Sequence, residues 1–142
     1  MSSHEQEIAG AVKVLALSAA QFLRCDPAKS HAVAIAAKGR FVVDEPRVWW
    51  LGFRRPHETH AYGDLQDWER RLVATIPPGT TRCWLIVESD GDSYPVYDVE
   101  VDVVAGVIKE CSFFEYYLVD PEFNWIVSDT DHNQLIFVRL AS

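Results

Sequence analysis

The 142-residue sequence lacks the short motifs that most often identify an enzyme. It has no GxSxG nucleophile motif, no phosphate-binding loop, no GxGxxG dinucleotide motif and no CxxC pair. If the protein has a catalytic site, the fold must assemble that site from residues that are distant in the sequence. The motif search therefore favours a non-catalytic protein that needs no cofactor.

Cysteines and long apolar runs are also scarce. Cys25, Cys83 and Cys111 are an odd number with no paired spacing, which indicates free thiols in a reducing compartment. No segment approaches the roughly 18 apolar residues of a membrane span. The apolar N-terminal stretch is not typical of a secretory signal, because Glu5 and Glu7 stand where a basic region is required. We therefore predict a soluble, cytoplasmic protein with no membrane partner.

Glycine and proline are sparse, with seven of each, and no segment is of low complexity. The composition, 49% hydrophobic and 24% charged, is typical of a globular protein. No period of about 20 to 50 residues recurs, which argues against a solenoid or a propeller. The length suits one domain with its own core, so we predict a single domain over residues 1–142.

Basic side chains are nearly absent from the last 60 residues, which begin at Cys83. This half holds twelve carboxylates, two basic side chains and ten of the seventeen aromatic residues. Residues 1–82 are nearly balanced, with eleven Lys and Arg against nine Asp and Glu. Such a field attracts basic partners and repels nucleic acid, so we expect a basic protein partner and no nucleic-acid partner.

Periodicity and turn residues predict the order of the elements. Residues 4–24 are expected to form an amphipathic helix, and residues 28–38 a short helix or an irregular connection that ends at Gly39. The remaining expected elements are a strand at 47–53, a loop at 54–64, a helix at 65–76, strands at 81–89 and 94–98, a helix at 101–110, and strands at 113–119, 123–128 and 134–139. Residues 96–111 fit both strand and helix spacing, and a strand to residue 98 followed by a helix from residue 101 is one interpretation of this ambiguous segment.

This order predicts an α+β fold, with N-terminal helices packed on one face of a mostly antiparallel sheet that ends in a three-strand meander. If residues 113–119 form a regular strand, they carry rings on both faces. Phe113, Tyr116 and Trp125 are then expected in the core, and Phe114 and Tyr117 on the opposite face. Two ring-bearing faces require either a helix layer on each side or a partner.

The stretch from Cys83 to Val138 carries a recognisable pattern. A tryptophan-bearing strand WLIVE is followed by EC-x-FFEYY-x-V and then by an aromatic strand. The matching residues are Glu88, Glu110, Cys111, Phe113 to Tyr117, Val119 and Trp125. The pattern resembles that of a family of small uncharacterised bacterial proteins, which have Cys-Glu-Asn-His-His where this chain has SDTDH at 128–132. More loosely, the size, acidity and element order resemble bacterial toxin-immunity proteins of the SMI1/KNR4-like kind, which implies an immunity-like role.

The first functional hypothesis is a non-catalytic cytosolic binding protein that captures a basic protein on its acidic, aromatic C-terminal sheet. Carboxylates would steer the partner and exposed rings would anchor it. The candidate binding residues are Asp98, Glu100, Asp102, Phe114, Glu115, Tyr117, Asp120 and Glu122.

Two polar clusters support an alternative, a metal-dependent hydrolase. His57 and His60 are three residues apart and could converge on a cation, and the DTDHN segment at 129–133 offers carboxylates and an imidazole. Both clusters also fit a loop and a hairpin turn, and the turn interpretation is favoured. The alternative metal site would comprise His57, His60, Asp129, Asp131 and His132. A third hypothesis is a structural homodimer subunit that buries the ring-bearing strand between copies; otherwise the protein is expected to be a monomer.

Overall fold

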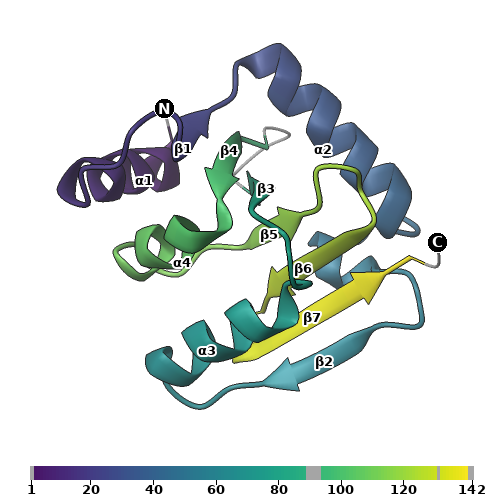
Figure 1. Cartoon of the computed structure of the whole chain (residues 1–142). Coiled ribbons are helices and arrows are strands. Elements are labelled where there is room, and N and C mark those ends of the chain that lie inside the picture. Colours follow the sequence, from purple (N-terminus) through teal and green to yellow (C-terminus); the bar gives the residue numbers. More distant parts are fainter. Residues whose placement is uncertain (1, 89–93, 131, 141–142) are drawn as a thin grey trace.

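The computed structural model describes residues 2–88, 94–130 and 132–140 (Figure 1). Seven strands form one sheet in the order β1-β4-β3-β5-β6-β7-β2, and every neighbouring pair is antiparallel. The α+β class is confirmed, and so is the terminal meander of three consecutive strands. In chain order the strands are β1 (Phe22–Arg24), β2 (Glu58–Ala61), β3 (Arg82–Val87), β4 (Val96–Glu100), β5 (Tyr116–Val119), β6 (Trp125–Asp129) and β7 (Gln134–Arg139).

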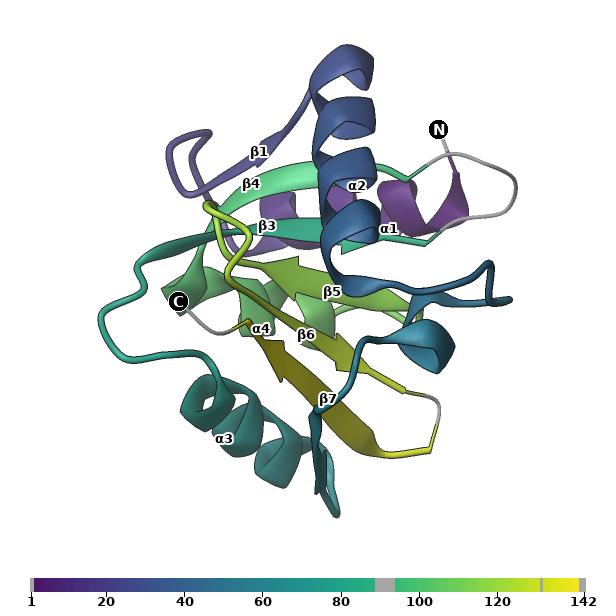
Figure 2. The ribbon, with the colours of Figure 1, turned by 90° about the vertical axis from the view of Figure 1, so that its right-hand side faces the viewer.

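Helices cover both faces of the sheet, whereas the sequence had predicted one helical face (Figures 1 and 2). One face packs against α1, α3 and α4, and the other against α2 and the short 3-10 helix η1. The reason is that the central strands are apolar on both faces, so each face needs a cover. The helices are α1 (Ser3–Val14), α2 (Pro27–Phe41), η1 (Trp49–Gly52), α3 (Leu65–Thr75) and α4 (Val101–Lys109).

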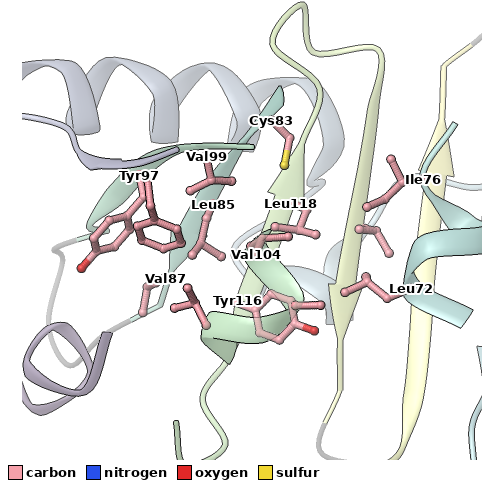
Figure 3. Close-up of a cluster of buried hydrophobic side chains, with 14 of the residues drawn as sticks. Leu72, Ile76, Cys83, Leu85, Val87, Tyr97, Val99, Val104, Tyr116 and Leu118 are labelled. Carbon is pink, nitrogen blue, oxygen red and sulfur yellow. The ribbon is translucent and has the colours of Figure 1, made fainter. Parts of the chain in front are cut away.

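Successive residues of the central strands enter two different core layers. Leu85 and Leu118 lie in the layer under α1, α3 and α4, while Ile86 and Val119 lie in the layer under α2. Figure 3 shows part of the first layer, with Tyr116 beside Leu118 and facing α3. The four aliphatic side chains of Leu85, Ile86, Leu118 and Val119 are fully buried, and burying each one stabilises the fold by about 1.5–3 kcal/mol.

The N-terminal helix is shorter than predicted. Ser2 caps α1 through a capping box with Glu5, but the helix ends at Val14 and Ala16 then adopts a positive φ of 54°. The chain turns back and Phe22 pairs with Val99 of β4. The expected helix to residue 24 was wrong because the last residues satisfy their backbone groups in a sheet ladder instead.

Other elements also differ from the sequence prediction, in extent or in type. Helix α2 continues through Gly39 to Phe41, which is completely buried and holds the last turn against the sheet. The expected strand at 47–53 is the helix η1, in which Trp49 is buried. The expected loop at 54–64 contains β2, whose sequence has no apolar alternation and which pairs with β7.

The other helices agree with the sequence. Asp64 caps α3 by accepting a hydrogen bond from the backbone N–H of Asp67. The helix begins at Val101 as predicted, while the strand before it spans Val96–Glu100 rather than the predicted 94–98. Among the described residues, no helix has the length and apolar character needed to cross a membrane.

Candidate functional site

A buried carboxylate at the end of β6 marks the candidate site. Trp125, Val127 and Asp129 alternate along β6 and face the same helical layer, because side chains two residues apart lie on one face of a strand. Asp129 is only 4% exposed and pairs in register with Leu135 of β7. The sequence interpretation placed Asp129 in a turn; the turn begins only after it, at Thr130.

Two tyrosines hold the Asp129 carboxylate. The Tyr62 hydroxyl donates to Oδ1 at 2.7 Å, and the Tyr116 hydroxyl donates to Oδ2 at 3.1 Å. The indole N–H of Trp68 donates to the Tyr116 hydroxyl oxygen at 3.1 Å, which fixes the direction of that hydroxyl. The network joins α3, β5, β6 and the segment between β2 and α3, and its inner members Trp68 and Tyr116 are buried.

Burial raises the pKa of the Asp129 carboxyl to about 6, from its ordinary value of 3.8. Loss of hydration is the main cause, since it disfavours the charged form. The hydrogen bonds from Tyr62 and Tyr116 oppose this effect, and the negative charge of Glu115 adds to it. Near neutral pH Asp129 is therefore an ionised carboxylate in an environment that disfavours its charge.

The two tyrosines remain hydrogen-bond donors over the same range of pH. Burial raises the pKa of both hydroxyls above the ordinary value, and the neighbouring Asp129 carboxylate raises each further. Neither phenol ionises near neutral pH as a result. Asp129 thus stays the titrating member of the network, and Tyr62 and Tyr116 orient it.

Asp129 opens into a cavity of about 310 Å³ between α3, α4 and the end of the meander. Five of the fourteen lining residues are aromatic, and Phe114 and Tyr116 meet edge to face with ring centroids 5.8 Å apart. We call this space the Asp129 cavity; it is lined by Tyr62, Gly63, Asp64, Leu65, Trp68, Ile108, Lys109, Cys111, Ser112, Phe113, Phe114, Tyr116, Asp129 and Asn133.

No positive side chain neutralises the Asp129 carboxylate within the described part of the chain. Lys109 is on the cavity wall, but its Nζ atom pairs with Glu69 Oε1 at 2.8 Å. The thiol of Cys111 also lines the cavity; it donates to the Val107 carbonyl, and burial raises its pKa to about 11. Cys111 is therefore a thiol rather than a thiolate near neutral pH.

Two of the predicted anchoring rings are buried, so the prediction that Phe114 and Tyr117 are exposed was wrong. Phe114 is 3% exposed and lines the Asp129 cavity. Tyr117 is fully buried under α2, where its hydroxyl donates to Glu88 Oε2 at 2.8 Å. Tyr116 and Trp125 are in the core as expected, but Phe113 precedes the strand and is 52% exposed.

A partly buried carboxylate, Glu88, lies on the opposite face at the same end of the sheet. It accepts hydrogen bonds from Tyr117 and from the backbone N–H of Trp49, and burial raises its pKa. The predicted binding residue Glu115 is next to it and accepts a hydrogen bond from the Trp50 indole at 2.9 Å. These contacts attach η1 to the sheet, so Glu88 and Glu115 have a structural role.

The other predicted acidic residues cluster at the opposite end of the sheet. Asp98 pairs with Arg82 at 2.9 Å, and Arg82 is opposite Glu100 in the register of β3 and β4. Trp84 of β3 is opposite Asp98 on one side and Val119 on the other, so Asp120, which follows Val119, lies at the same end of the sheet as Asp98. The remaining acids of this end, Asp102 and Glu122, are exposed.

The structure separates the described residues of the predicted metal site. His60 is on β2 with Leu135 of β7 between it and Asp129, and its Nε2 atom is 3.9 Å from Glu58. His132 is exposed, with its ring edge against Trp50. His57 precedes β2, and Asp131 lies outside the described residues. Among the residues that are described, no three His, Cys, Asp or Glu side chains converge on a metal position.

Sequence reasoning named Asp129 but missed its partners Tyr62, Trp68 and Tyr116 as a group. One signal was present: Asp129 continues the spacing of Trp125 and Val127, which predicts that it faces the core. Tyr62 carried no such signal, because its position depends on a backbone hydrogen bond from Tyr62 to the Asn133 carbonyl, 71 residues further along the chain.

Comparisons of the chain with protein-family models, with curated proteins and with solved structures found no match.

Proposed function

We propose that the protein is a non-catalytic binding protein whose Asp129 cavity holds a small molecule with a protonated amine and an apolar or aromatic body. The observation that carries this proposal is the Asp129 carboxylate, buried at the end of an aromatic cavity with no lysine or arginine paired to it in the described part of the chain. Pockets of this kind, apolar with a few convergent polar groups and a shifted pKa, are the usual form of ligand sites.

The charge of the site favours a cationic ligand. A carboxylate has about four acceptor positions, and the hydroxyl groups of Tyr62 and Tyr116 occupy one on each oxygen of Asp129. A ligand ammonium group that used the remaining positions would offset the loss of hydration that raises the Asp129 pKa. The formal net charge of −8 would favour the approach of a cation from solution.

The walls of the cavity favour an apolar or aromatic body on the same ligand. Rings from three different parts of the chain line this space: Tyr62, Trp68, and the pair Phe114 and Tyr116. Aromatic faces attract ammonium groups and also pack against apolar groups. Phe113 is half exposed at the same cavity, so a bound ligand would bury part of its ring.

A pair of matched probes tests this proposal by NMR. Phenethylammonium and 2-phenylethanol share one ring and differ in the charge of the terminal group. We expect phenethylammonium to shift the amide resonances of residues that line the Asp129 cavity in a saturable way, and 2-phenylethanol to bind more weakly. The substitution Asp129→Asn is expected to remove this preference, and Asp102→Asn, which changes the same group at an exposed site, is expected to keep it. Equal binding of both probes, or shifts elsewhere on the molecule, would contradict the proposal.

A second candidate function is supported by the acidic end of the sheet. Glu100, Asp102 and Glu122 have no ion pair with another described residue, and they lie at the end that also holds Asp98 and Asp120. We propose this end as a surface for a basic protein, in place of the buried rings Phe114 and Tyr117. An immunity-like role would use such a surface.

Native co-purification tests the second candidate. A basic protein retained by the wild type should elute as salt rises, because screening weakens attraction between exposed charges. It should be lost from a Glu100→Gln, Asp102→Asn, Glu122→Gln variant. Retention by that variant, or elution that does not depend on salt, would remove this candidate.

A further inference from the structure

A second cavity, at the other end of α3, is lined by two arginines, whereas the Asp129 cavity has none. Its volume is about 360 Å³, and it shares no lining residue with the Asp129 cavity. Helix α3 forms one wall, and the edge strand β2 with its neighbour β7 forms the other. The lining residues are Glu58, His60, Arg71, Ala74, Thr75, Pro77, Pro78, Phe137 and Arg139.

The register of β2 and β7 explains how these side chains meet. Glu58 of β2 is opposite Phe137 of β7, and Arg139 lies two residues beyond Phe137 on the same face. His60 is two residues beyond Glu58 on β2, so it also faces α3. The strands therefore deliver one arginine and one imidazole to the groove beneath the C-terminal half of α3, which supplies Arg71.

Two guanidinium groups with unused donors face this cavity. Arg71 uses its Nε–H on Asp67 Oδ2 at 3.2 Å, and its terminal nitrogens have no hydrogen bond to another described residue. Arg139 is exposed and has no ion pair or hydrogen bond from its side chain within the described part of the chain. One carboxylate, Glu58, faces the same space and is 3.9 Å from His60 Nε2.

We propose that this Arg71–Arg139 cavity binds an oxyanion, a phosphate or carboxylate group carried on a small apolar molecule. The lining holds two arginines and one glutamate, although the whole chain carries −8, and only Arg71 of the two arginines pairs with a carboxylate of the described residues, Asp67. The guanidinium group offers planar, paired N–H donors that match the two oxygens of a carboxylate or phosphate. The floor, Phe137, is 6% exposed, and Ala74, Pro77 and Pro78 add an apolar wall for the rest of the ligand.

Each side chain of the proposed anion site has a separate role. Arg139 has no side-chain partner among the described residues, so it can contact the anion directly. Arg71 donates its Nε–H to Asp67. This hydrogen bond orients the terminal nitrogens of Arg71 and lowers the conformational entropy that the side chain loses on binding. The His60 imidazole has an N–H to offer as a further donor, and Glu58 beside it would disfavour anions that approach from the β2 side.

Titrations with phenyl phosphate, benzoate and benzyl alcohol test this proposal at constant ionic strength. The three probes share a ring and carry a phosphate, a carboxylate or no charge. We expect one or both anions to shift the side-chain Nε–H resonances of Arg71 and Arg139 in a saturable way, and the neutral alcohol to leave them unchanged. The stronger anion identifies the group that the site takes.

Two single-charge variants separate a site from general attraction. Arg139→Gln should weaken binding of that anion by about tenfold. Lys13→Gln removes one positive charge from the exposed last turn of α1, away from the cavity, and should leave the affinity unchanged. Far-UV circular dichroism confirms that both variants fold. No saturable shift with either anion, an equal response to benzyl alcohol, or the same loss in Lys13→Gln would overturn the proposal.

Discussion

At the scale of single residues, Asp129 occupies a position that costs stability near neutral pH. Its pKa in the folded protein is about 6, above the ordinary 3.8, so the folded state binds the proton more tightly than the unfolded state. The protonated Asp129 side chain therefore contributes fully to the free energy of unfolding below about pH 4, and this contribution is lost as pH rises through about 6. The difference corresponds to on the order of 3 kcal/mol. A carboxylate that costs stability is typical of a residue kept for binding.

Replacing Asp129 with Asn should stabilise the protein near pH 8, by up to about 3 kcal/mol, because an amide loses less on burial than an ionised carboxylate. Near pH 4 the two proteins should differ little, since Asp129 is then protonated. Urea unfolding of both proteins across this range of pH measures the effect. A stability difference that is the same at every pH would show that Asp129 titrates normally and would contradict the burial argument.

Replacing Tyr62 with Phe should raise the pKa of Asp129 further above 6. The Tyr62 hydroxyl donates to Oδ1 and favours the ionised carboxyl, so removing it favours the protonated form. Carbon-13 NMR of the Asp129 carboxyl as pH is varied measures the shift directly. Tyr97→Phe is the control, because Tyr97 lies near Arg24 and does not contact Asp129. An Asp129 pKa that falls or stays unchanged in Tyr62→Phe would contradict the network.

At the scale of elements, α3 supports both cavities, since its N-terminal half lines the Asp129 cavity and its C-terminal half lines the Arg71–Arg139 cavity. Leu72 is 1% exposed, and its substitution by Ala should cost about 2–5 kcal/mol through lost burial and a cavity. Val73 on the same helix is 57% exposed, and Val73→Ala should change stability by about 0.5 kcal/mol or less. Chemical unfolding of both variants measures this contrast, and similar losses would show that α3 is not docked as described.

The elements that sequence predicted well are those whose own side chains determine them. Helix α3 has its cap at Asp64 and apolar residues such as Trp68 and Leu72 at helical spacing. Strand β2 could not be predicted in this way, because its sequence ETHA has no apolar alternation and its structure depends on the backbone of β7. Likewise, the sequence showed rings on both faces of β5, but only the arrangement of α2 and η1 reveals that Tyr117 is covered.

At the scale of the whole molecule, the two core layers share the same strands. Leu85 and Ile86 are neighbours on β3 and lie in different layers, so loss of either layer would expose the other side of the strand. We therefore predict that the chain unfolds as one cooperative unit. Trp68 reports on one layer and Trp49 on the other, so tryptophan fluorescence and far-UV circular dichroism should give the same midpoint. Two separate midpoints would contradict the single-domain prediction.

The charge distribution of the whole molecule differs from its division in the sequence. The acidic half does not form one acidic face: Glu88, Glu115 and Asp129 are at one end of the sheet with hydrogen-bonded aromatic partners, while Asp98, Glu100 and Asp120 are at the other end. Sequence alone could not separate these groups, because the antiparallel order of β3, β4 and β5 decides which end each residue occupies. The proposed sites follow this spatial division.

The central claim is that Asp129 is the anionic group of a ligand site. Its most direct test is the affinity of phenethylammonium measured as a function of pH. Isothermal titration calorimetry of the wild type should show affinity that rises by about tenfold between about pH 5 and pH 7.5, because Asp129 ionises over this range while the ligand stays protonated. In Asp129→Asn the affinity should be weak and independent of pH. Tight binding that is independent of pH in the wild type, or binding that Asp129→Asn leaves unchanged, would contradict the account.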